Sequence, residues 1–228
     1  MREIKIAPSI LAGDLSNLGG SVRAADEGGA DQIHLDVIDG HFAPNITFGA
    51  GTVKALRVLS DLPFDTNLMI SDPLKYAKKF IEAGSNIISF HVEVLDTHGF
   101  MELRSLLRKE GVRMGLALKP GTSLPRWARE NLDKLDVLLV MTVNPGFSGQ
   151  ALDTAVLPKL GELASLVRAG DLPLDVEVDG GVGESNVNEV VKRGGNVLVA
   201  GAGVYGRGEV GRAIRALRET AVNAMVIK

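Results

Sequence analysis

The chain has 228 residues, 45% of them hydrophobic, which suits one large α/β domain or two small ones. Its zero cysteines exclude disulfides, thiolate metal ligands and a cysteine nucleophile, and its net charge of -3 excludes the basic field that nucleic-acid binding needs. No apolar run approaches the roughly 18 residues of a membrane span, and a strand-like run starts almost at once, so we see no secretory signal and expect a cytoplasmic protein that does not bind membranes.

Short runs rich in Ile, Val and Leu alternate along the chain with longer amphipathic stretches. In chain order, the runs predict strands near residues 4–10, 32–37, 64–69, 87–92, 113–118, 137–143, 174–178 and 197–200. The stretches between them carry apolar residues three and four positions apart and predict helices over 15–28, 73–83, 99–110, 151–168, 184–193 and 209–222. Ser71-Asp72-Pro73 is typical of a helix N-cap followed by proline in the first turn.

The strands are apolar on both faces, as buried parallel strands are. Eight strand–helix units in this length predict an α/β fold of the (β/α)8 TIM barrel type. A doubly wound open sheet is the alternative, but eight regular repeats leave no clear switch point. No linker or low-complexity tract interrupts the pattern, so we expect a single domain over 1–228. Glycines gather directly after the strands, and in a barrel those turns form the face where active sites lie.

Polar residues occur at strand ends where a barrel core would normally be apolar. Side chains two apart on a strand share a face, so His34 lies with Asp36, and Glu177 lies one layer below Asp179. By the same rule the inward positions include Asn67 and His91. A lone aspartate at a strand end is usually a turn former. Two of them joined by a histidine favour a functional site, because unpartnered buried polar groups cost about 1–3 kcal/mol each.

Asp36 and Asp179 could therefore face each other across a small substrate. One would remove a proton from one face while the other returns a proton to the opposite face, which inverts a stereocentre beside a carbonyl. Glycine turns after the seventh and eighth strands, Gly180-Gly181 and Gly201-Ala202-Gly203, predict a phosphate cradle. The loop 144–150 after the sixth strand contains Phe147 and is expected to close over a phosphorylated substrate.

Several long motifs in order give the chain a specific resemblance. They are Ile6-Ala7-Pro8-Ser9-Ile10-Leu11, Ile33-His34-Leu35-Asp36-Val37, Ile38-Asp39-Gly40-His41-Phe42, Asn45-Ile46-Thr47-Phe48-Gly49, Asn144-Pro145-Gly146-Phe147 and Glu177-Val178-Asp179-Gly180-Gly181. Along nearly its whole length the chain resembles the ribulose-phosphate 3-epimerase family. The resemblance implies a ribulose-phosphate-binding (β/α)8 barrel that interconverts D-ribulose 5-phosphate and D-xylulose 5-phosphate. It also implies that Asp36 and Asp179 are the acid/base pair, with a divalent metal between them.

The family's site residues carry over by position. The substrate contacts would be Ser9, His34, Met69, Met141, Gly146, Gly149, Gly181, Gly201 and Ala202, of which the glycines and Ala202 form the phosphate site. His34, Asp36 and Asp179 fall on three of the four metal-ligand positions. The family usually has serine where Ala202 stands, a mild departure because the backbone N–H remains. The resemblance also implies a homo-oligomer.

The fourth metal-ligand position departs from the family, because Asn67 stands where the family has histidine. The metal could be Zn, Fe, Mn, Co or Mg, and three outcomes are open. Asn67 oxygen could bind the metal and favour Mn²⁺ or Mg²⁺ over Zn²⁺. The metal could keep three protein ligands and water. Or there could be no metal, with the Asn67 amide donating to a substrate oxygen as part of an oxyanion hole.

Two other functions stay open beside the pentose phosphate epimerase. One is a 3-epimerase of a six-carbon ketose phosphate such as allulose 6-phosphate, which the pocket wall does not exclude. The other is a phosphosugar-binding protein that has lost catalysis. The sequence assigns no role to His91, Glu93, Lys119 or Glu177, although a second-layer partner is favoured for Glu177.

Overall fold

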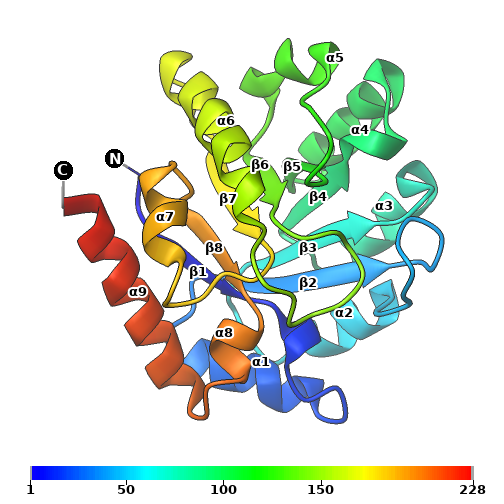
Figure 1. The fold of residues 1–228 in the computed structure, drawn as a ribbon. Helices are drawn as coiled ribbons and strands as arrows, with labels where there is room; N and C mark the ends of the chain where they lie inside the picture. Colours follow the sequence, from blue (N-terminus) through cyan, green and yellow to red (C-terminus); the bar gives the residue numbers. More distant parts are fainter. Residues whose placement is uncertain (1, 227–228) are drawn as a thin grey trace.

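Eight parallel strands form one sheet that curls into a nearly closed barrel in the computed structural model, which describes residues 2–226 (Figure 1). The strands are β1 (Lys5–Pro8), β2 (Ile33–Ile38), β3 (Phe64–Met69), β4 (Ile87–His91), β5 (Arg113–Leu118), β6 (Val137–Met141), β7 (Asp175–Asp179) and β8 (Val197–Ala200). The sheet order β1-β8-β7-β6-β5-β4-β3-β2 brings the first and last strands together. The predicted TIM barrel is confirmed, and the doubly wound alternative is wrong.

The barrel has one seam, between β1 and β2, where no regular ladder runs. Near the bottom of the seam, Ile6 and Asp31 exchange two hydrogen bonds, Asp31 N–H to Ile6 O at 3.0 Å and Ile6 N–H to the Asp31 carboxylate at 2.6 Å. Near the top, Ser9 and His34 form an isolated parallel bridge. The seam therefore depends on fewer backbone hydrogen bonds than the seven regular strand pairs do.

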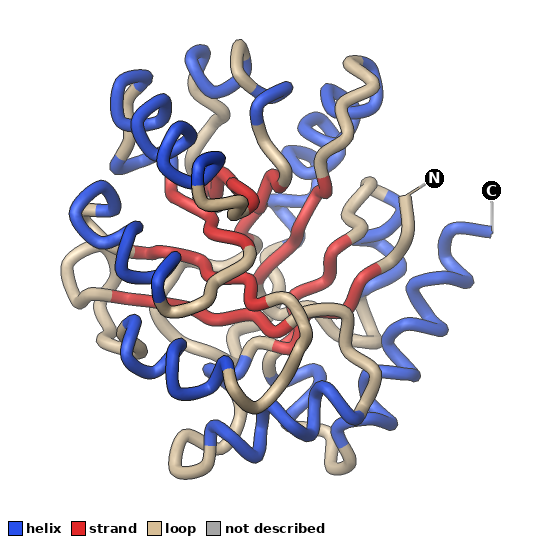
Figure 2. The backbone as a smooth tube through the Cα atoms, turned by 180° about the vertical axis from the view of Figure 1, so that it is seen from behind, coloured by secondary structure: helices blue, strands red, loops and turns tan. Residues whose placement is uncertain are grey.

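Helices surround the barrel, as the blue ring around red strands in Figure 2 shows. They are α1 (Leu18–Glu27), α2 (Ala50–Arg57), α3 (Pro73–Glu82), α4 (Thr97–Lys109), α5 (Arg126–Arg129), α6 (Leu157–Ala169), α7 (Val187–Lys192), α8 (Ala202–Tyr205) and α9 (Val210–Val226), with the short 3-10 helices η1 (Ile10–Ala12), η2 (Val92–Val94), η3 (Leu132–Lys134) and η4 (Thr154–Val156). Within residues 2–226, no helix is long and apolar enough to cross a membrane.

The six predicted helices are present with shifted ends, whereas α2, α5 and α8 were not predicted. The start of α3 is as expected, since the Asp72 side chain accepts a hydrogen bond from Lys75 N–H and Pro73 is the first helical residue. The start of α1 moves to Leu18 because Asn17 caps it by accepting from Gly20 N–H. Helix α2 was missed because its N-cap residue is Gly49, which offers no side-chain cap, and because it contains another glycine, Gly51.

The alternation of strand side chains divides the core into two parts. On β2, Ile33 and Leu35 pack outward against the helices in the large apolar cluster, whereas Ile38 belongs to a smaller cluster that fills the barrel with Met69, Ile87, Ala117, Val137, Leu139 and Met141. The interior also holds buried polar residues. They are Ser9, His34, Asp36, Asp65, Asn67, Ser89, His91, Glu177 and Asp179, none more than 8% exposed. This polar group occupies space that a purely structural barrel would fill with apolar side chains.

Candidate active site

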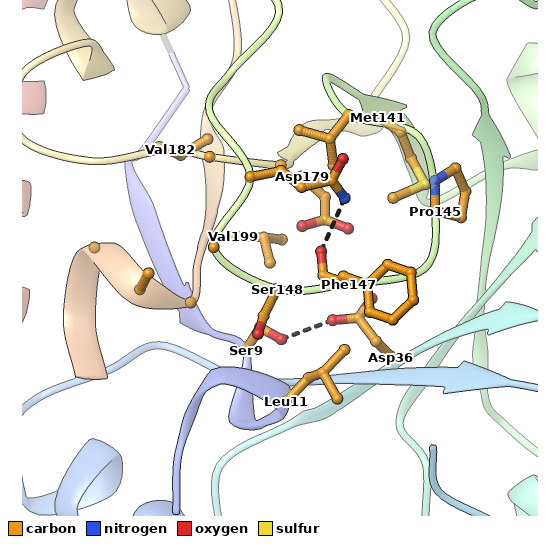
Figure 3. Close-up of a pocket in the computed structure, with 18 of the residues that line it drawn as sticks. Ser9, Leu11, Asp36, Met141, Pro145, Phe147, Ser148, Asp179, Val182 and Val199 are labelled. Carbon is orange, nitrogen blue, oxygen red and sulfur yellow. Dashed lines mark hydrogen bonds between the residues drawn. The ribbon is translucent and has the colours of Figure 1, made fainter. Parts of the chain in front are cut away.

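A pocket of about 210 Å³ opens at the carboxyl end of the barrel (Figure 3). Most of the predicted site residues line it: Ser9, Asp36, Met69, Met141, Gly146, Gly149, Asp179, Gly181, Gly201 and Ala202. His34 and Asn67 do not line it, and both are fully buried in the barrel. The pocket is also lined by residues that the sequence did not single out, among them Leu11, Ser185, Val199 and Arg207.

Asp36 lies near the end of β2 and points into the pocket. The Ser9 hydroxyl donates to its Oδ2 at 2.6 Å, the lower dashed line in Figure 3. Its Oδ1 lies 3.3 Å from His34 Nε2. Burial pushes the pKa of Asp36 upward, but the charge of His34, 3.3 Å away, and the hydrogen bond from Ser9 outweigh it and hold the pKa below its usual value. Asp36 is therefore a carboxylate at neutral pH.

Asp179 is the last residue of β7 and differs from Asp36 in its protonation. Burial, with a further contribution from the charge of Asp36, raises the pKa of Asp179 to about 7. One ligand atom from each of His34, Asp36 and Asp179 lies within 4.8 Å of the others. The pocket thus holds two acids on separate strands, one with a lowered pKa and one with a raised pKa, so that one can be a carboxylate while the other keeps its proton, which is the pairing that proton removal and proton return require.

Beneath the pocket, the other nitrogen of His34 faces two more acids. His34 Nδ1 lies 2.9 Å from Asp65 Oδ2 and 3.1 Å from Glu177 Oε1. The amide of Gln32 donates to the same Asp65 oxygen at 2.8 Å. Burial, and then the charge of Asp65, raise the pKa of Glu177 well above its usual value, which keeps Glu177 neutral. Glu177 lies one layer below Asp179, as predicted, and contacts His34; Asp65 was not predicted.

The charge of His34 follows from these neighbours. Burial lowers its pKa, but the charges of Asp36 and Asp65 outweigh burial and raise the pKa well above its usual value. Four buried carboxyl groups, those of Asp36, Asp65, Glu177 and Asp179, thus share a single buried imidazole. With Glu177 kept neutral and the pKa of Asp179 raised, the charges of Asp36 and Asp65 still outnumber that of the one imidazole, which suits the site to a cation.

Asn67 completes the upper layer. It stands beside Asp36 on one side and Ser89 on the other in the strand register. Neither its Oδ1 nor its Nδ2 has a hydrogen-bond partner among the described residues, and the same holds for His34 Nε2 and Asp36 Oδ1. Buried polar atoms left in this way cost about 1–3 kcal/mol each. One imidazole nitrogen and several oxygens therefore converge without partners, and this donor set fits a divalent metal ion.

The loop after β6 folds back on itself beside the pocket. Gln150 donates its side-chain N–H to Asn144 O at 3.0 Å and to Phe147 O at 2.9 Å. Asn45, from the segment after β2, donates to Gly146 O at 2.7 Å and ties the two loops together. The Phe147 side chain is 60% exposed. An apolar ring left exposed at the pocket mouth is consistent with the predicted closure over a substrate, which stays a prediction.

The two glycine turns after β7 and β8 pack against each other and against this loop. A Cβ on Gly203 would lie 2.5 Å from Val182 O, and a Cβ on Gly181 would lie 2.3 Å from Leu152 N. Gly181 also has a φ of +67°, which L residues rarely adopt. Only glycine allows these backbones to approach so closely, and both glycines line the pocket.

His91, Glu93 and Lys119 form a separate cluster beside the polar core. His91 Nδ1 lies 3.1 Å from Glu93 Oε2, and Lys119 N–H donates to Glu93 Oε1 at 2.9 Å. Phe42 packs between them, 4.6 Å from the His91 ring and 3.7 Å below the Lys119 ammonium. Burial raises the pKa of Glu93, but hydrogen bonds from His91 and Thr122 outweigh it and lower the pKa to about 2. The cluster does not line the pocket.

Comparison with known proteins agrees with this geometry. The sequence model described as "Ribulose-phosphate 3 epimerase family" matches residues 5–205. The chain belongs to this family. A ribulose-phosphate 3-epimerase from Bacillus subtilis is 43% identical over 217 residues, covering 94% of this chain and 98% of the relative. A ribulose-phosphate 3-epimerase from Aquifex aeolicus is 39% identical over 222 residues, covering 97% and 99%.

Solved structures resemble the chain in fold. The crystal structure of KGPDC from Streptococcus mutans has a TM-score of 0.73 at 17% identity, covering 98% of this chain and 99% of that one. A 3-hexulose-6-phosphate synthase has a TM-score of 0.64 at 18% identity, covering 95% and 99%. At these identities the likeness shows the shared barrel and nothing further.

Proposed function

We propose that the chain inverts C3 of a ketose phosphate and interconverts D-ribulose 5-phosphate and D-xylulose 5-phosphate. The observation that carries the proposal is the pair Asp36 and Asp179, two buried acids on separate strands of one pocket that differ in protonation. Membership of the ribulose-phosphate 3-epimerase family and the names of the relatives at about 40% identity support the same reaction.

The chemistry follows from the acidity of the hydrogen at C3, which lies next to the C2 ketone. The Asp36 carboxylate removes that proton from one face, and negative charge develops on the C2 and C3 oxygens of an enediolate. The Asp179 carboxylic acid then delivers its proton to the opposite face. After one turnover the two acids have exchanged protonation states, which suits a reversible reaction that the pair can begin from either side.

The charge on the enediolate needs stabilisation in the pocket. We propose that His34 Nε2, which loses its proton when the metal binds, together with Asp36 and Asp179 holds a divalent metal ion, with Asn67 Oδ1 as the fourth ligand. Support comes from the unpartnered buried atoms of His34, Asp36 and Asn67 and from the excess of buried carboxyl groups around one imidazole. When bound, the ion supplies electrostatic stabilisation of the developing oxyanions. With one nitrogen against three oxygens, the donor set favours Mn²⁺ or Mg²⁺ over Zn²⁺.

The remaining pocket residues position the substrate. We propose that Ser9 contacts a substrate hydroxyl and that Met69 and Met141 form the apolar wall of the pocket, which all three line. The glycine-rich backbone at Gly146, Gly149, Gly181, Gly201 and Ala202 would receive the phosphate, and the loop with Phe147 would exclude water from the enediolate. Fixing the phosphate at one end of a pocket of about 210 Å³ orients C3 between the two aspartates.

The test is deuterium exchange at C3 in D₂O with ribulose 5-phosphate as the substrate. Asp36→Asn and Asp179→Asn should each abolish formation of xylulose 5-phosphate that carries deuterium at C3, because each removes one half of the proton relay. Asp133→Asn, on the exposed surface of η3, is the matched control and should exchange as the wild type does. Near-normal formation of deuterated xylulose 5-phosphate in either site variant would refute the two-acid scheme.

The same assay separates the other functions. Binding of ribulose 5-phosphate without exchange in the wild type would indicate a phosphosugar-binding protein, and faster exchange with a six-carbon ketose phosphate would indicate the hexulose phosphate enzyme. The single domain over 1–228 is supported by the one eight-stranded sheet, although residues 1 and 227–228 lie outside the described part. The cytoplasmic location and the homo-oligomer stay predictions.

A further inference from the structure

We infer that Arg207 provides a side-chain charge that binds the substrate's phosphate group, in addition to the glycine-rich backbone. The inference rests on the proposed function, in that it takes the pocket to receive a phosphorylated ketose. Arg207 lies in the turn between α8 and α9, and it lines the same pocket as Asp36 and Asp179.

The charge balance of the pocket is the first argument. Arg207 is the only lysine or arginine among the residues that line it, whereas Asp36 is a carboxylate in the same space. A phosphate monoester carries a charge of about −1.5 to −2 at neutral pH. Without Arg207, no side chain that lines the pocket would offer that dianion a positive charge.

The position of the turn is the second argument. Gly206 follows α8 closely, donating its N–H to Ala202 O at 3.1 Å, and a Cβ on Gly206 would lie 2.8 Å from the same oxygen. The residue after Gly206 is thereby held close to α8. The start of that helix, Ala202, belongs to the proposed phosphate site. Gly183 and Ser185, from the neighbouring turn after β7, line the pocket as well.

The availability of the guanidinium is the third argument. Among residues 2–226, Arg207 makes no ion pair and no side-chain hydrogen bond, and it is exposed. The nearest acid in the sequence, Glu209, is already engaged. Its two oxygens accept from Gly211 N–H and Arg212 N–H, both at 2.9 Å, and one lies 3.5 Å from Arg215.

Arg207 therefore has its full charge available to a ligand. Glycine on both sides of it, at 206 and 208, leaves the backbone few steric restraints, and nothing lies within 4 Å of a Cβ placed on Gly208. A guanidinium suits this role because its planar array of N–H donors matches two oxygens of a phosphate at once. A phosphate bound here contacts a cation and backbone amides together.

The experiment measures binding of inorganic phosphate by calorimetry, and then KM and kcat for ribulose 5-phosphate. Arg207→Gln should weaken phosphate binding about tenfold, the effect of roughly 1.4 kcal/mol, and raise KM by a similar factor while kcat changes little. Arg207→Lys should recover part of the loss. Arg212→Gln removes the same charge from an exposed position outside the pocket and should match the wild type.

Phosphate binding within twofold of the wild type in Arg207→Gln would overturn the inference, as would an effect of equal size in Arg212→Gln. The binding arm does not depend on catalysis. If Arg207→Gln loses phosphate affinity while the wild type shows no exchange at C3, the inference holds and the proposed function fails. If exchange is normal and the affinity is unchanged, the proposed function holds and the inference fails.

Discussion

Gly181 and Gly149 offer a matched pair for testing how the loop after β6 is held against the β7 turn. Both have positive φ, +67° and +80°, so replacing either with alanine costs about 1–2 kcal/mol for the left-handed backbone. Their surroundings differ. A Cβ on Gly149 meets nothing within 4 Å, whereas a Cβ on Gly181 would lie 2.3 Å from Leu152 N and 2.6 Å from Gln150 O.

The contacts at Gly181 are all with backbone atoms, which cannot rotate away as the end of a side chain can. The loop would have to move, and overpacking of this kind typically costs a further 1–3 kcal/mol, roughly. We expect Gly149→Ala to lower the free energy of unfolding by about 1–2 kcal/mol and Gly181→Ala by about 2–5 kcal/mol. Since the displaced loop lines the pocket, Gly181→Ala should also weaken phosphate binding.

Urea unfolding of the two variants measures the difference, provided that the dependence on denaturant stays the same. The comparison cancels the cost of positive φ and leaves the cost of the close approach. If Gly181→Ala is destabilised no more than Gly149→Ala, the loop is not held against this turn, and the explanation of the glycine is refuted.

Three further predictions concern the polar core. Protein stripped by a chelator should regain C3 exchange better with Mn²⁺ or Mg²⁺ than with Zn²⁺. Asp65→Asn should weaken Mn²⁺ binding about tenfold or more, because His34 loses the carboxylate that orients it. Unchanged Mn²⁺ affinity in a chelator competition would contradict the role of Asp65. In the metal-free protein, burial raises the pKa of Asp179 from 3.8 to about 7. The contribution of the protonated Asp179 to the free energy of unfolding is therefore fully present below about pH 4 and is lost as the pH rises through about 7. Asp179→Asn, which stays neutral, should be more stable than the wild type near about pH 8 but not near about pH 4 in urea titrations, and a difference that does not vary with pH would show that Asp179 is not buried as an acid.

The sequence predicted the parts of the fold that a strong local pattern specifies. Most strands contain enough apolar residues to recognise, and the side-chain alternation placed His34, Asp36 and Asp179 inside the barrel. Helices α5 and α8 have four residues each, too few to show a period of 3.6. The ends of the strands also shifted by a few residues, since hydrogen bonding and not hydrophobicity ends a strand.

The site residues likewise divide into those that a local sequence pattern could predict and those that it could not. Asp65 lies two residues before Asn67 on β3, so the alternation that turned Asn67 inward could have found it. The meeting of Asp65 and Glu177 at His34 Nδ1, by contrast, depends on the arrangement of β2, β3 and β7 around the barrel. No local sequence pattern contains that arrangement. Arg207 follows the last strand in a turn with no periodicity, and only the path of the chain after α8 brings it to the pocket.

The seam between β1 and β2 links the site to the integrity of the barrel. At its upper end the hydrogen bond from Ser9 to Asp36 spans the two strands where no ladder does. A change in the charge of Asp36, or the binding of a ligand to it, therefore alters the contact between β1 and β2 as well as the proton transfer. Local opening of the barrel should start there, and amide hydrogens along β1 and β2 would exchange with solvent more slowly when a ligand holds Asp36 in place. Ligand affinity and the rate of local opening of the barrel therefore both depend on the hydrogen bond between Ser9 and Asp36.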